Sequence, residues 1–469
     1  MRLSVRAVIL AGGKGTRLVG IDAKPLAPLL GKKLIDYPLT QVLDFFRSEN
    51  VDGSVSVVTG HKSEDVEKYV KESYPNIPIS FSLQEKPLGT GDALNSYFTA
   101  HCESSSQYDL TLVLCADTPL LTAQNIKALY EKCLEDQVQG ALATFVTPNP
   151  YGYGRIIRSE SGLSIVEEQE ADELQRSVKE VNSGLYLFKT DFVVKKLQGL
   201  KPRGDKGEYY LTDVIESGDM VKPILSSDEK CFLGVNNLEQ LEEAEKELLN
   251  RKVCRLRGKG VRFLMSDTVY IEDDVVIGEG SVIYPNTLFF GKTTIGKGCI
   301  IEAGAVVRNS LVGDGTVVKS YSYLDEATVF QDVKIGPFAH LRPKTIAENF
   351  VKIGNFVEIK KATLCEGSKV SHLSYVGDAE VGERTNIGCG FITCNYDGAQ
   401  KHFTKIGKDS FVGSDTQMIA PVEIGDRCFV ASGSTIGQSM PSGSFAIARS
   451  RQITKEGMAK KFIKNKEEL

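Results

Sequence analysis

Hydrophobic and polar positions follow different periods in the two halves of the chain. In the first half, short runs of apolar and β-branched residues alternate with runs whose apolar residues recur at helical spacing. This pattern predicts strands over 4–10, 54–58 and 111–114, and helices over 39–49 and 63–71. Such alternation is typical of a mainly parallel sheet covered by helices, where ligands bind at the carboxyl ends of the strands.

The pattern changes after residue 238. A charged stretch with leucines along one side predicts a helix over 238–249 that connects two domains. After about residue 261, aliphatic residues recur every six positions, in two runs: Ile271, Ile277, Ile283, Phe289, Ile295, Ile301 and Val307, then Ile406, Val412, Met418, Ile424, Val430 and Ile436. A period of six fits a parallel β-helix in which each side of a triangular coil contributes one inward-facing aliphatic residue. We expect these residues to form the core and to do no chemistry.

These patterns predict four segments: a first domain at 1–237, a connecting helix and linker at 238–260, a β-helix at 261–451 and a tail at 452–469. The 469 residues are 41% hydrophobic and 25% charged, as in a soluble globular protein. The net charge of −5 gives no reason to expect nucleic-acid binding. Because neither a signal peptide nor an apolar run of about 18 residues is present, we expect a cytoplasmic protein that does not enter a membrane.

The first candidate for chemistry is a glycine loop that follows the first predicted strand. It runs from Leu10 to Leu18, with glycines at Gly12, Gly13 and Gly15. Glycines let backbone N–H groups approach a polyphosphate closely, although a tight turn needs them too. The loop has neither the Walker nor the dinucleotide-binding pattern.

Together with Lys24-Pro25-Leu26, the loop LAGGKGTRL resembles the signature of sugar-1-phosphate nucleotidyltransferases. More stretches fit that family in the same order: Gln84 to Gly91, Cys115 to Pro119, Gly152 to Arg155, Val166-Glu167, Val181 to Gly184, and Gly234 to Asn237. The resemblance implies that a sugar-phosphate oxygen attacks the α-phosphorus of a nucleoside triphosphate and releases pyrophosphate. Such a reaction needs charge neutralisation more than covalent help.

The same resemblance implies roles for individual residues. Asp117 and Asn236 would hold Mg²⁺, and Arg17 and Lys24 would hold the triphosphate. UTP and the sugar would contact the following residues: Leu10, Gly12, Gly13, Gln84, Gly89 and Thr90 on the nucleotide side, and Gly154, Glu167 and Asn182 on the sugar side. Each of these residues alone also fits a loop or capping role.

In the second half the resemblance becomes closer. The chain from about Val5 to Arg451 resembles the bifunctional N-acetylglucosamine-1-phosphate uridylyltransferase / glucosamine-1-phosphate N-acetyltransferase family. The stretches that carry it are Ile335 to Pro343, Gly354 to Lys361, Ser371 to Ala379, Asn386 to Gly388, Thr393 to Gly398, and Gly413 to Thr416. The resemblance implies an α/β nucleotidyltransferase domain with a Rossmann-like, mainly parallel sheet, a left-handed parallel β-helix of hexapeptide repeats, and a closed homotrimer.

Acetyl transfer requires an amine to attack a thioester, so a base that titrates near pH ~6.5 is useful. The chain has five histidines. His61 and His101 lie in the other domain, His340 precedes an inward aliphatic residue and so points outward, and His402 lies in a polar insertion. His372, inside the matched stretch SHLSYVGDAE, is therefore the predicted base, although in isolation it reads as an ordinary surface or core histidine.

The remaining acetyltransferase roles come from the resemblance alone. The sugar phosphate and the sugar would contact Arg342, Lys360, Tyr375, Asn386 and Lys401. Acetyl-CoA would contact Cys389, Asn395, Tyr396, Ser414, Ser432 and Arg449. Cys389 stands where family members carry a small alanine, and Ser432 stands at another position that is usually small and apolar, so both can alter the acyl-CoA path.

Three functions stay open at this point. The leading hypothesis is a bifunctional enzyme that acetylates glucosamine-1-phosphate and then transfers a uridylyl group to the product. A single-activity nucleotidyltransferase with a structural β-helix is the second, and a non-enzymatic sensor or subunit is the third. The joint presence of His372, Tyr375, Asn386 and Asn395 argues against the second, because a structural coil does not need them together.

Overall fold

The computed structural model describes residues 3–101, 107–159, 162–203 and 207–462. The chain divides into two units, 1–250 and 251–469, and the division falls inside helix α7 (Leu238–Gly258). The charged stretch after residue 238 is therefore one helix, which continues nine residues beyond the predicted range.

The first unit is built on one sheet with strand order β11-β7-β10-β6-β1-β4-β5. Strand β10 is antiparallel to both of its neighbours on this path, whereas the other neighbouring strands are parallel. Two further strands, β8 and β9, extend this sheet beside β10, and β2 and β3 form a separate two-stranded hairpin. The strands are β1 (Val5–Ala11), β2 (Pro28–Leu29), β3 (Lys32–Lys33), β4 (Gly53–Thr59), β5 (Ile79–Leu83), β6 (Leu110–Cys115), β7 (Gly140–Val146), β8 (Arg155–Ser159), β9 (Gly162–Val166), β10 (Glu180–Lys189) and β11 (Val221–Leu225).

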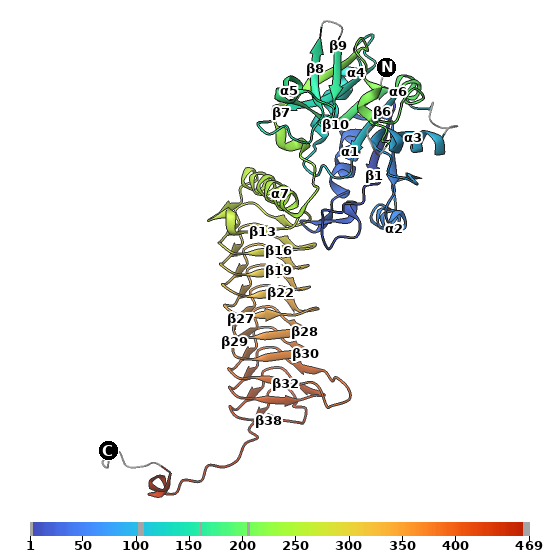
Figure 1. Cartoon of the computed structure of the whole chain (residues 1–469). Helices are drawn as coiled ribbons and strands as arrows, with labels where there is room; N and C mark the ends of the chain where they lie inside the picture. The colour runs from blue at the N-terminus through green and yellow to red at the C-terminus, as the bar shows by residue number, and fades with distance from the viewer. Residues whose placement is uncertain (1–2, 102–106, 160–161, 204–206, 463–469) are drawn as a thin grey trace. The chain divides into compact units, whose positions relative to one another are not determined.

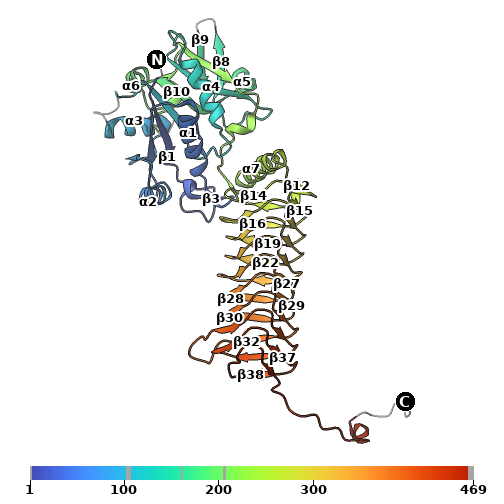
Figure 2. The ribbon, with the colours of Figure 1, turned by 180° about the vertical axis from the view of Figure 1, so that it is seen from behind.

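Helices cover both faces of this sheet, and Figures 1 and 2 show the two faces from opposite sides. Alternate strand residues face opposite layers: Val5, Ala7 and Ile9 belong to one core cluster, and Val8 belongs to the other. This alternation is the pleat of a sheet buried on both sides. The helices are α1 (Asp36–Glu49), α2 (Ser63–Ser73), α3 (Thr90–Ala100), α4 (Ala123–Cys133), α5 (Glu173–Ser177) and α6 (Thr190–Leu197).

The strands and helices predicted for the first half are present, with ends that differ by at most three residues. The largest of these shifts is at α1, which starts at Asp36 rather than at residue 39. Asp36 is buried and accepts hydrogen bonds from the Lys33 backbone N–H (2.8 Å) and the Tyr69 hydroxyl (2.6 Å). An apolar pattern cannot reveal a helix start that depends on a buried carboxylate.

The second unit is a parallel β-helix, drawn in yellow to red in Figure 1. One sheet contains β12 (Arg262–Phe263), β15 (Val282–Ile283), β18 (Ile300–Ile301), β21 (Val317–Val318), β24 (Lys334–Ile335), β27 (Lys352–Asn355), β29 (Lys369–His372), β31 (Asn386–Ile387), β34 (Phe411–Val412), β37 (Phe429–Val430) and β39 (Phe445–Ala446).

The other sides of the coil contain β13 (Tyr270–Ile271), β14 (Val276–Ile277), β16 (Leu288–Phe290), β17 (Thr294–Ile295), β19 (Val306–Arg308), β20 (Leu311–Val312), β22 (Tyr323–Asp325), β23 (Thr328–Val329), β25 (His340–Leu341), β26 (Ile346–Ala347), β28 (Glu358–Leu364), β30 (Tyr375–Val381), β32 (Ile392–Cys394), β33 (Thr404–Ile406), β35 (Gln417–Ile419), β36 (Val422–Ile424) and β38 (Thr435–Ile436).

Successive coils pair in parallel, usually at a separation of 17 or 18 residues: Val276 pairs with Thr294 and Lys352 pairs with Lys369. Every residue of the two predicted six-residue runs is at most 5% exposed, so the predicted core is confirmed. Dry packing of one aliphatic residue per side supplies the main stabilising term of such a coil, at roughly 1.5–3 kcal/mol per fully buried aliphatic side chain.

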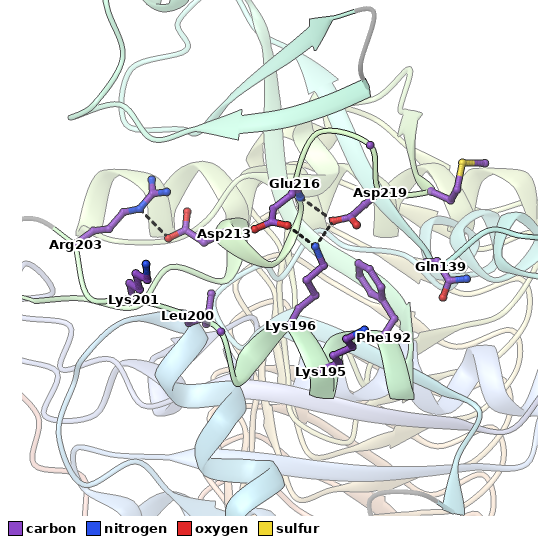
Figure 3. A pocket seen from close by; sticks show the side chains of 13 residues that line it. Gln139, Phe192, Lys195, Lys196, Leu200, Lys201, Arg203, Asp213, Glu216 and Asp219 are labelled. Carbon is purple, nitrogen blue, oxygen red and sulfur yellow. Dashed lines mark hydrogen bonds and ion pairs between the residues drawn. The ribbon is translucent and has the colours of Figure 1, made fainter.

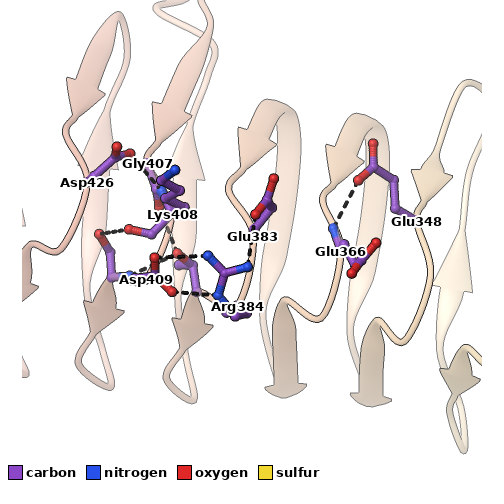
Figure 4. A network of polar contacts seen from close by, with 10 residues as sticks. Glu348, Glu366, Glu383, Arg384, Gly407, Lys408, Asp409 and Asp426 are labelled. Carbon is purple, nitrogen blue, oxygen red and sulfur yellow. Dashed lines mark hydrogen bonds and ion pairs between the residues drawn. The ribbon is translucent and has the colours of Figure 1, made fainter.

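One coil is longer than its neighbours. Arg384 lies 25 residues before its partner Asp409, because a loop between β32 and β33 is inserted there. Arg384 donates two hydrogen bonds to Asp409, at 2.7 and 3.0 Å, and one to Glu383 at 2.9 Å (Figure 4). These contacts tie the edges of adjacent coils together where the repeat is interrupted.

Candidate active sites

The glycine loop follows β1 and lies against two predicted site residues. A Cβ at Gly12 would lie 2.8 Å from Oε1 of Gln84, so a larger residue there would displace that side chain. At Gly15, φ is +63° and a Cβ would lie 2.6 Å from Cβ of Lys24. These glycines are therefore required for close approach, as expected for a phosphate-binding loop. Arg17 is exposed in the same loop, as are Gly13 and Lys14.

Lys24, Asp117 and Asn236 meet at the carboxyl end of the sheet. The Lys24 ammonium group donates to an Asp117 carboxylate oxygen and, at 2.8 Å, to Oδ1 of Asn236. The Lys24 side chain is 11% exposed and the Asp117 side chain 27%, so the carboxylate is neutralised in a partly desolvated environment. The two predicted metal ligands thus converge on one cation, although they lie far apart in the sequence.

The thiol beside this cluster is inert. Burial, and then the nearby Asp117 carboxylate, raise the pKa of Cys115 to about 12. The thiol therefore stays protonated at neutral pH and does not compete with Asp117 as a ligand or a nucleophile.

The predicted uracil-reading residues form a second group. Gln84 is 8% exposed, and its Nε2 donates to the Gly89 carbonyl oxygen (3.0 Å) and to the Asp92 carboxylate (2.8 Å). The Thr90 hydroxyl accepts a hydrogen bond from the Leu211 backbone N–H at 3.1 Å. Gln84 is thus held in one orientation, and Asp92, which sequence reasoning missed, helps to hold it.

The predicted sugar-binding residues form a third group. Glu167 accepts a hydrogen bond from the Thr212 hydroxyl at 2.7 Å, and burial raises the pKa of its carboxyl. A Cβ at Gly154 would lie 3.6 Å from both oxygens of Glu167, so glycine leaves the carboxylate accessible. Asn182 donates to the Tyr186 hydroxyl at 2.5 Å, and its backbone N–H donates to the Gly154 carbonyl oxygen at 2.9 Å. Thr212 lies in no matched motif, so no signal in the sequence identified it.

A cavity of about 820 Å³ lies elsewhere in the first unit, at the end of α6 (Figure 3). Inside it, the Lys196 ammonium group bridges Glu216 at 2.7 Å and Asp219 at 2.8 Å, so its main charges are already paired. None of the predicted site residues lines this cavity, and its size does not make it the active site.

In the β-helix, several predicted acetyltransferase residues lie on one corner of the coil, at the carboxyl ends of the strands of the β12–β39 sheet. His372 pairs in register with Asn355 of the preceding coil. Farther along the same corner, the Asp415 backbone N–H donates to the Cys389 carbonyl oxygen (2.7 Å), and the Gly433 N–H donates to the Ser414 carbonyl oxygen (2.8 Å). The Arg449 guanidinium then donates to the Ser432 carbonyl oxygen at 2.8 Å.

Three cationic residues, Arg342, Lys360 and Lys401, gather on one side of this corner. Contact with Lys401, and then the charge of Arg342, lower the pKa of Lys360. Arg342 also pairs with Glu358 at 2.7 Å, and this pair is solvent-exposed at the rim. The positive charge of such a cluster suits the binding of an anion. Lys361, the neighbour of Lys360, is exposed.

The inserted loop carries two more predicted residues, Asn395 and Tyr396, and Figure 1 shows it projecting beside β32. Nδ2 of Asn395 donates to Asp378 at 2.5 Å and anchors the base of the loop. Nε2 of His402 lies 2.6 Å from the Asp397 carboxylate within the loop. His402 therefore has a loop-stabilising contact, and Tyr396 is exposed.

Tyr375 and Asn386 lie on the two strands that flank the corner, at the starts of β30 and β31, and both are half-buried. His340 is exposed at the start of β25, as predicted. The structure thus places the predicted acetyltransferase residues along consecutive coils of the second unit, between β25 and the end of the helix.

Both units of the chain are similar to known protein families. The nucleotidyl transferase family matches residues 6–248, the GMPPB C-terminal domain matches residues 265–348, and the bacterial transferase hexapeptide repeat matches residues 403–438. Proteins named bifunctional protein GlmU from Shouchella clausii and Exiguobacterium sp. are 41% and 39% identical to this chain, and each alignment covers 97% of this chain and 99% of the relative. The protein of that name from Staphylococcus haemolyticus is 41% identical, over 97% of this chain and 99% of its own length.

The chain belongs to the bifunctional GlmU family. Membership confirms the predicted bifunctional enzyme, with uridylyl transfer in a nucleotidyltransferase unit and acetyl transfer in a hexapeptide unit. It also confirms the predicted fold, a mainly parallel α/β domain followed by a left-handed β-helix of hexapeptide repeats.

As in a GlmU protein, both halves act on small molecules, a nucleotide in the first and an acyl-CoA in the second. Among the helices within the described residues, none combines the length and apolar character needed to cross a bilayer.

Proposed function

We propose that the β-helix at 261–451 transfers an acetyl group from acetyl-CoA to the amine of glucosamine-1-phosphate. The domain at 1–237 would then transfer a uridylyl group from UTP to the product and release pyrophosphate. The order follows from the chemistry, because the acetylated sugar phosphate is the acceptor of the second reaction. The observation that supports the proposal is that each unit holds its own cluster of charged and titratable groups: Lys24, Asp117 and Asn236 in the first, and Arg342, Lys360 and Lys401 in the second.

In the uridylyl reaction, the acceptor is already an anionic phosphate oxygen, so no general base is required. Lys24 and Arg17 would neutralise the triphosphate as charge moves to the leaving pyrophosphate. Gln84 and the backbone around Gly89 would hold the base, and Glu167 would accept hydrogen bonds from sugar hydroxyls. The product would be UDP-N-acetylglucosamine, a sugar nucleotide of cell-wall synthesis.

Asp117 and Asn236 fit Mg²⁺. Both present an oxygen to a single cation, Lys24, and one carboxylate plus one neutral oxygen is a donor set that Mg²⁺ accepts beside substrate phosphates. When bound, Mg²⁺ would neutralise charge on the phosphates. Because the Lys24 ammonium lies between the two oxygens and brings a positive charge to them, we expect metal binding there to be accompanied by displacement of Lys24 from Asp117.

This displacement predicts that metal and triphosphate bind together, since the triphosphate offers Lys24 a new anion. Binding of Mn²⁺, measured by the electron paramagnetic resonance signal of the free ion, tests it without catalysis. The parent should bind Mn²⁺ weakly without UTP, and Lys24→Met should bind it about tenfold more tightly, equal to about 1.4 kcal/mol. Lys14→Met, which removes an exposed lysine of the same loop, is the matched control; equal Mn²⁺ affinity in all three proteins would contradict the displacement.

In the acetyl reaction, His372 would remove a proton from the sugar amine as the nitrogen attacks the thioester carbonyl carbon. The carbon–sulfur bond then breaks, and coenzyme A leaves as a thiolate that takes up the proton from His372. Arg342, Lys360 and Tyr375 would hold the sugar phosphate, and Asn386 and Lys401 would position the sugar. Acetyl-CoA would lie along the corner past Cys389, Ser414 and Ser432 to Arg449, with Asn395 and Tyr396 near the thioester.

A homotrimer is part of the proposal, and one feature of the same corner supports it. Tyr321, Phe338 and Phe356 occupy successive coils with stacked rings 5.3 and 5.4 Å apart, and Leu373 follows them. All four have positive φ, between 42° and 58°, and are 48–61% exposed. Bulky side chains in the left-handed region cost stability, so an exposed column of them indicates a surface that another copy covers. Light scattering on the purified chain measures the mass that tests this.

The proposal places the enzyme in the cytoplasm, since UTP and acetyl-CoA are intracellular metabolites. The decisive experiment is release of the coenzyme A thiol on mixing the purified protein with acetyl-CoA and glucosamine-1-phosphate. Release should depend on the sugar phosphate and be lost in His372→Ala. No release, with UTP turnover on N-acetylglucosamine-1-phosphate intact, would leave a nucleotidyltransferase with a structural β-helix.

A further inference from the structure

The ring of His372 has a single hydrogen-bond partner within the described part of the chain. Nδ1 of His372 lies 2.7 Å from Oδ1 of Asn355, the residue 17 positions earlier on the preceding coil. An amide oxygen can only accept, so the proton of the neutral imidazole must lie on Nδ1. The lone pair is then on Nε2, which is the nitrogen directed away from Asn355.

The backbone around this contact is held more firmly than elsewhere on the same sheet. Strands β27 and β29 have four residues each, whereas the other described strands of that sheet have two. The Asn355 carbonyl oxygen also accepts from the Leu373 backbone N–H at 3.0 Å, so Asn355 contacts both the ring of His372 and the backbone of the residue that follows it. The His372 carbonyl oxygen accepts from the buried Ser374 hydroxyl at 2.7 Å.

Gly354 makes this close pairing possible. A Cβ at that position would lie 1.8 Å from the Ser371 carbonyl oxygen, a distance that no side chain can tolerate. The two coils therefore approach each other closely immediately before Asn355 and His372. Main-chain geometry, rather than the exposed side chains themselves, sets the distance between the amide and the imidazole.

From this geometry we infer that Asn355 is a positioning residue for acetyl transfer: it holds His372 in the tautomer and orientation in which Nε2 takes the proton of the substrate amine. The inference rests on the proposed role of His372 as the base. An amide suits the task better than a carboxylate, because a carboxylate in contact with the ring would favour the imidazolium form, which cannot accept a proton.

Two substitutions separate the loss of the hydrogen-bond acceptor from the addition of a negative charge. Asn355→Leu keeps the approximate size and removes the acceptor, so kcat for acetyl transfer should fall about 10–100-fold with KM for both substrates nearly unchanged. Asn355→Asp keeps an acceptor but adds a charge, so the acid limb of the pH–rate profile should move to higher pH by about one unit. Uridylyl transfer by the same preparations should stay at the parent rate, and an unchanged melting temperature of the second unit should report that the β-helix is folded.

A readout that does not depend on catalysis is carbethoxylation of the imidazole by diethyl pyrocarbonate, located by peptide mass spectrometry in the full-length protein. Only the unprotonated ring reacts, so the midpoint of the reaction against pH reports its titration. The His372 midpoint should rise in Asn355→Asp, and that of His340, an exposed histidine of an earlier coil, should not. An unchanged His372 midpoint would overturn the inference.

Failure of the inference can be distinguished from failure of the proposed function. If His372→Ala retains acetyl transfer, His372 is not the base and the proposed mechanism is wrong. If His372→Ala is inactive but Asn355→Leu shows the parent kcat and pH profile, the base stands and Asn355 does not position it. If Asn355→Leu does not fold, the carbethoxylation midpoint in Asn355→Asp still decides the question.

Discussion

The two units assemble their candidate sites in opposite ways. In the α/β unit, Lys24 contacts Asp117 and Asn236 across separations of 93 and 212 residues, and the strand ends of the sheet bring them together. In the β-helix, the site residues recur along one corner, where neighbouring coils repeat every 17 or 18 residues. A site of the first kind has no period along the sequence, whereas a site of the second kind follows the period that builds the fold.

The energetic demands on the two sites also differ. The Lys24–Asp117 pair is largely shielded from water, so removing one member leaves an uncompensated charge in a partly desolvated environment. His372 and most of the acetyl-CoA residues are exposed, and the coils beneath them are stabilised by aliphatic residues that no substrate touches. We therefore expect mutations in the first site to affect both stability and activity, and mutations in the second site to affect activity alone.

The largest predicted effect is the separation of the two activities by single substitutions. Asp117→Ala should lower uridylyl transfer at least about 1,000-fold, because it removes the proposed metal ligand and leaves Lys24 without its anion. Acetyl transfer, measured as coenzyme A release, should stay at the parent rate. Asp44→Ala, which removes an exposed carboxylate of α1, is the control; loss of both reactions in folded Asp117→Ala would refute independent sites.

The complementary experiment, which should remove acetyl transfer and spare uridylyl transfer, is His372→Ala. Without a base, acetyl transfer should fall about 100- to 10,000-fold at pH 7, and uridylyl transfer should not change. His340→Gln replaces another exposed histidine of the β-helix and should leave both rates unchanged. Should His340→Gln be as inactive as His372→Ala, the assignment of the base would be wrong.

A third prediction sets stability against activity at Glu167. Burial raises the pKa of this carboxyl in the folded protein above its pKa in the unfolded chain. Folding stability therefore falls as the pH rises from the unfolded-state pKa to the folded-state pKa. Glu167→Gln should therefore raise the melting temperature of the first unit by about 2–4 °C at pH 7. This gain should vanish below about pH 4, where the carboxyl is protonated in both states.

The same substitution should weaken sugar binding. Loss of a charged acceptor predicts that KM for N-acetylglucosamine-1-phosphate rises about 10–100-fold in uridylyl transfer. Glu168→Gln, which neutralises the neighbouring carboxylate that pairs with Arg155, is the matched comparison. If the difference in melting temperature between Glu167→Gln and the parent is the same at pH 4 and at pH 7, Glu167 is not desolvated.

The smallest effect is expected at Cys389, on the corner between His372 and Ser414. Cys389→Ala removes one sulfur atom, and the added space should shift the ratio of kcat/KM for acetyl-CoA and propionyl-CoA by about 2–10-fold in favour of the larger acyl group. Ser432→Ala, farther from His372 on the same corner, should change this ratio less. Identical ratios in the parent and in Cys389→Ala would exclude a role of the thiol in acyl preference.

Much of this architecture was predictable from the sequence. The alternating runs of the first half located three of its strands, β1, β4 and β6, to within one residue, and the six-residue period identified the buried aliphatic residues of the coil. Both succeed because burial imposes the local period of each element on the chain. Motif order, through resemblance to a known family, then named most of the candidate site residues.

The tertiary structure alone decided which of those residues touch one another and what holds them. That Lys24 lies between Asp117 and Asn236, that Thr212 and Asp92 support Glu167 and Gln84, and that Asn355 holds the ring of His372 are contacts between separate strands, loops or coils. Asn355 stands one coil period before His372, but the period alone does not show that its side chain contacts the ring, and Thr212 and Asp92 leave no periodic trace at all. Local patterns follow from the chain itself, whereas contacts of this kind exist only once the sheet and the coils have formed.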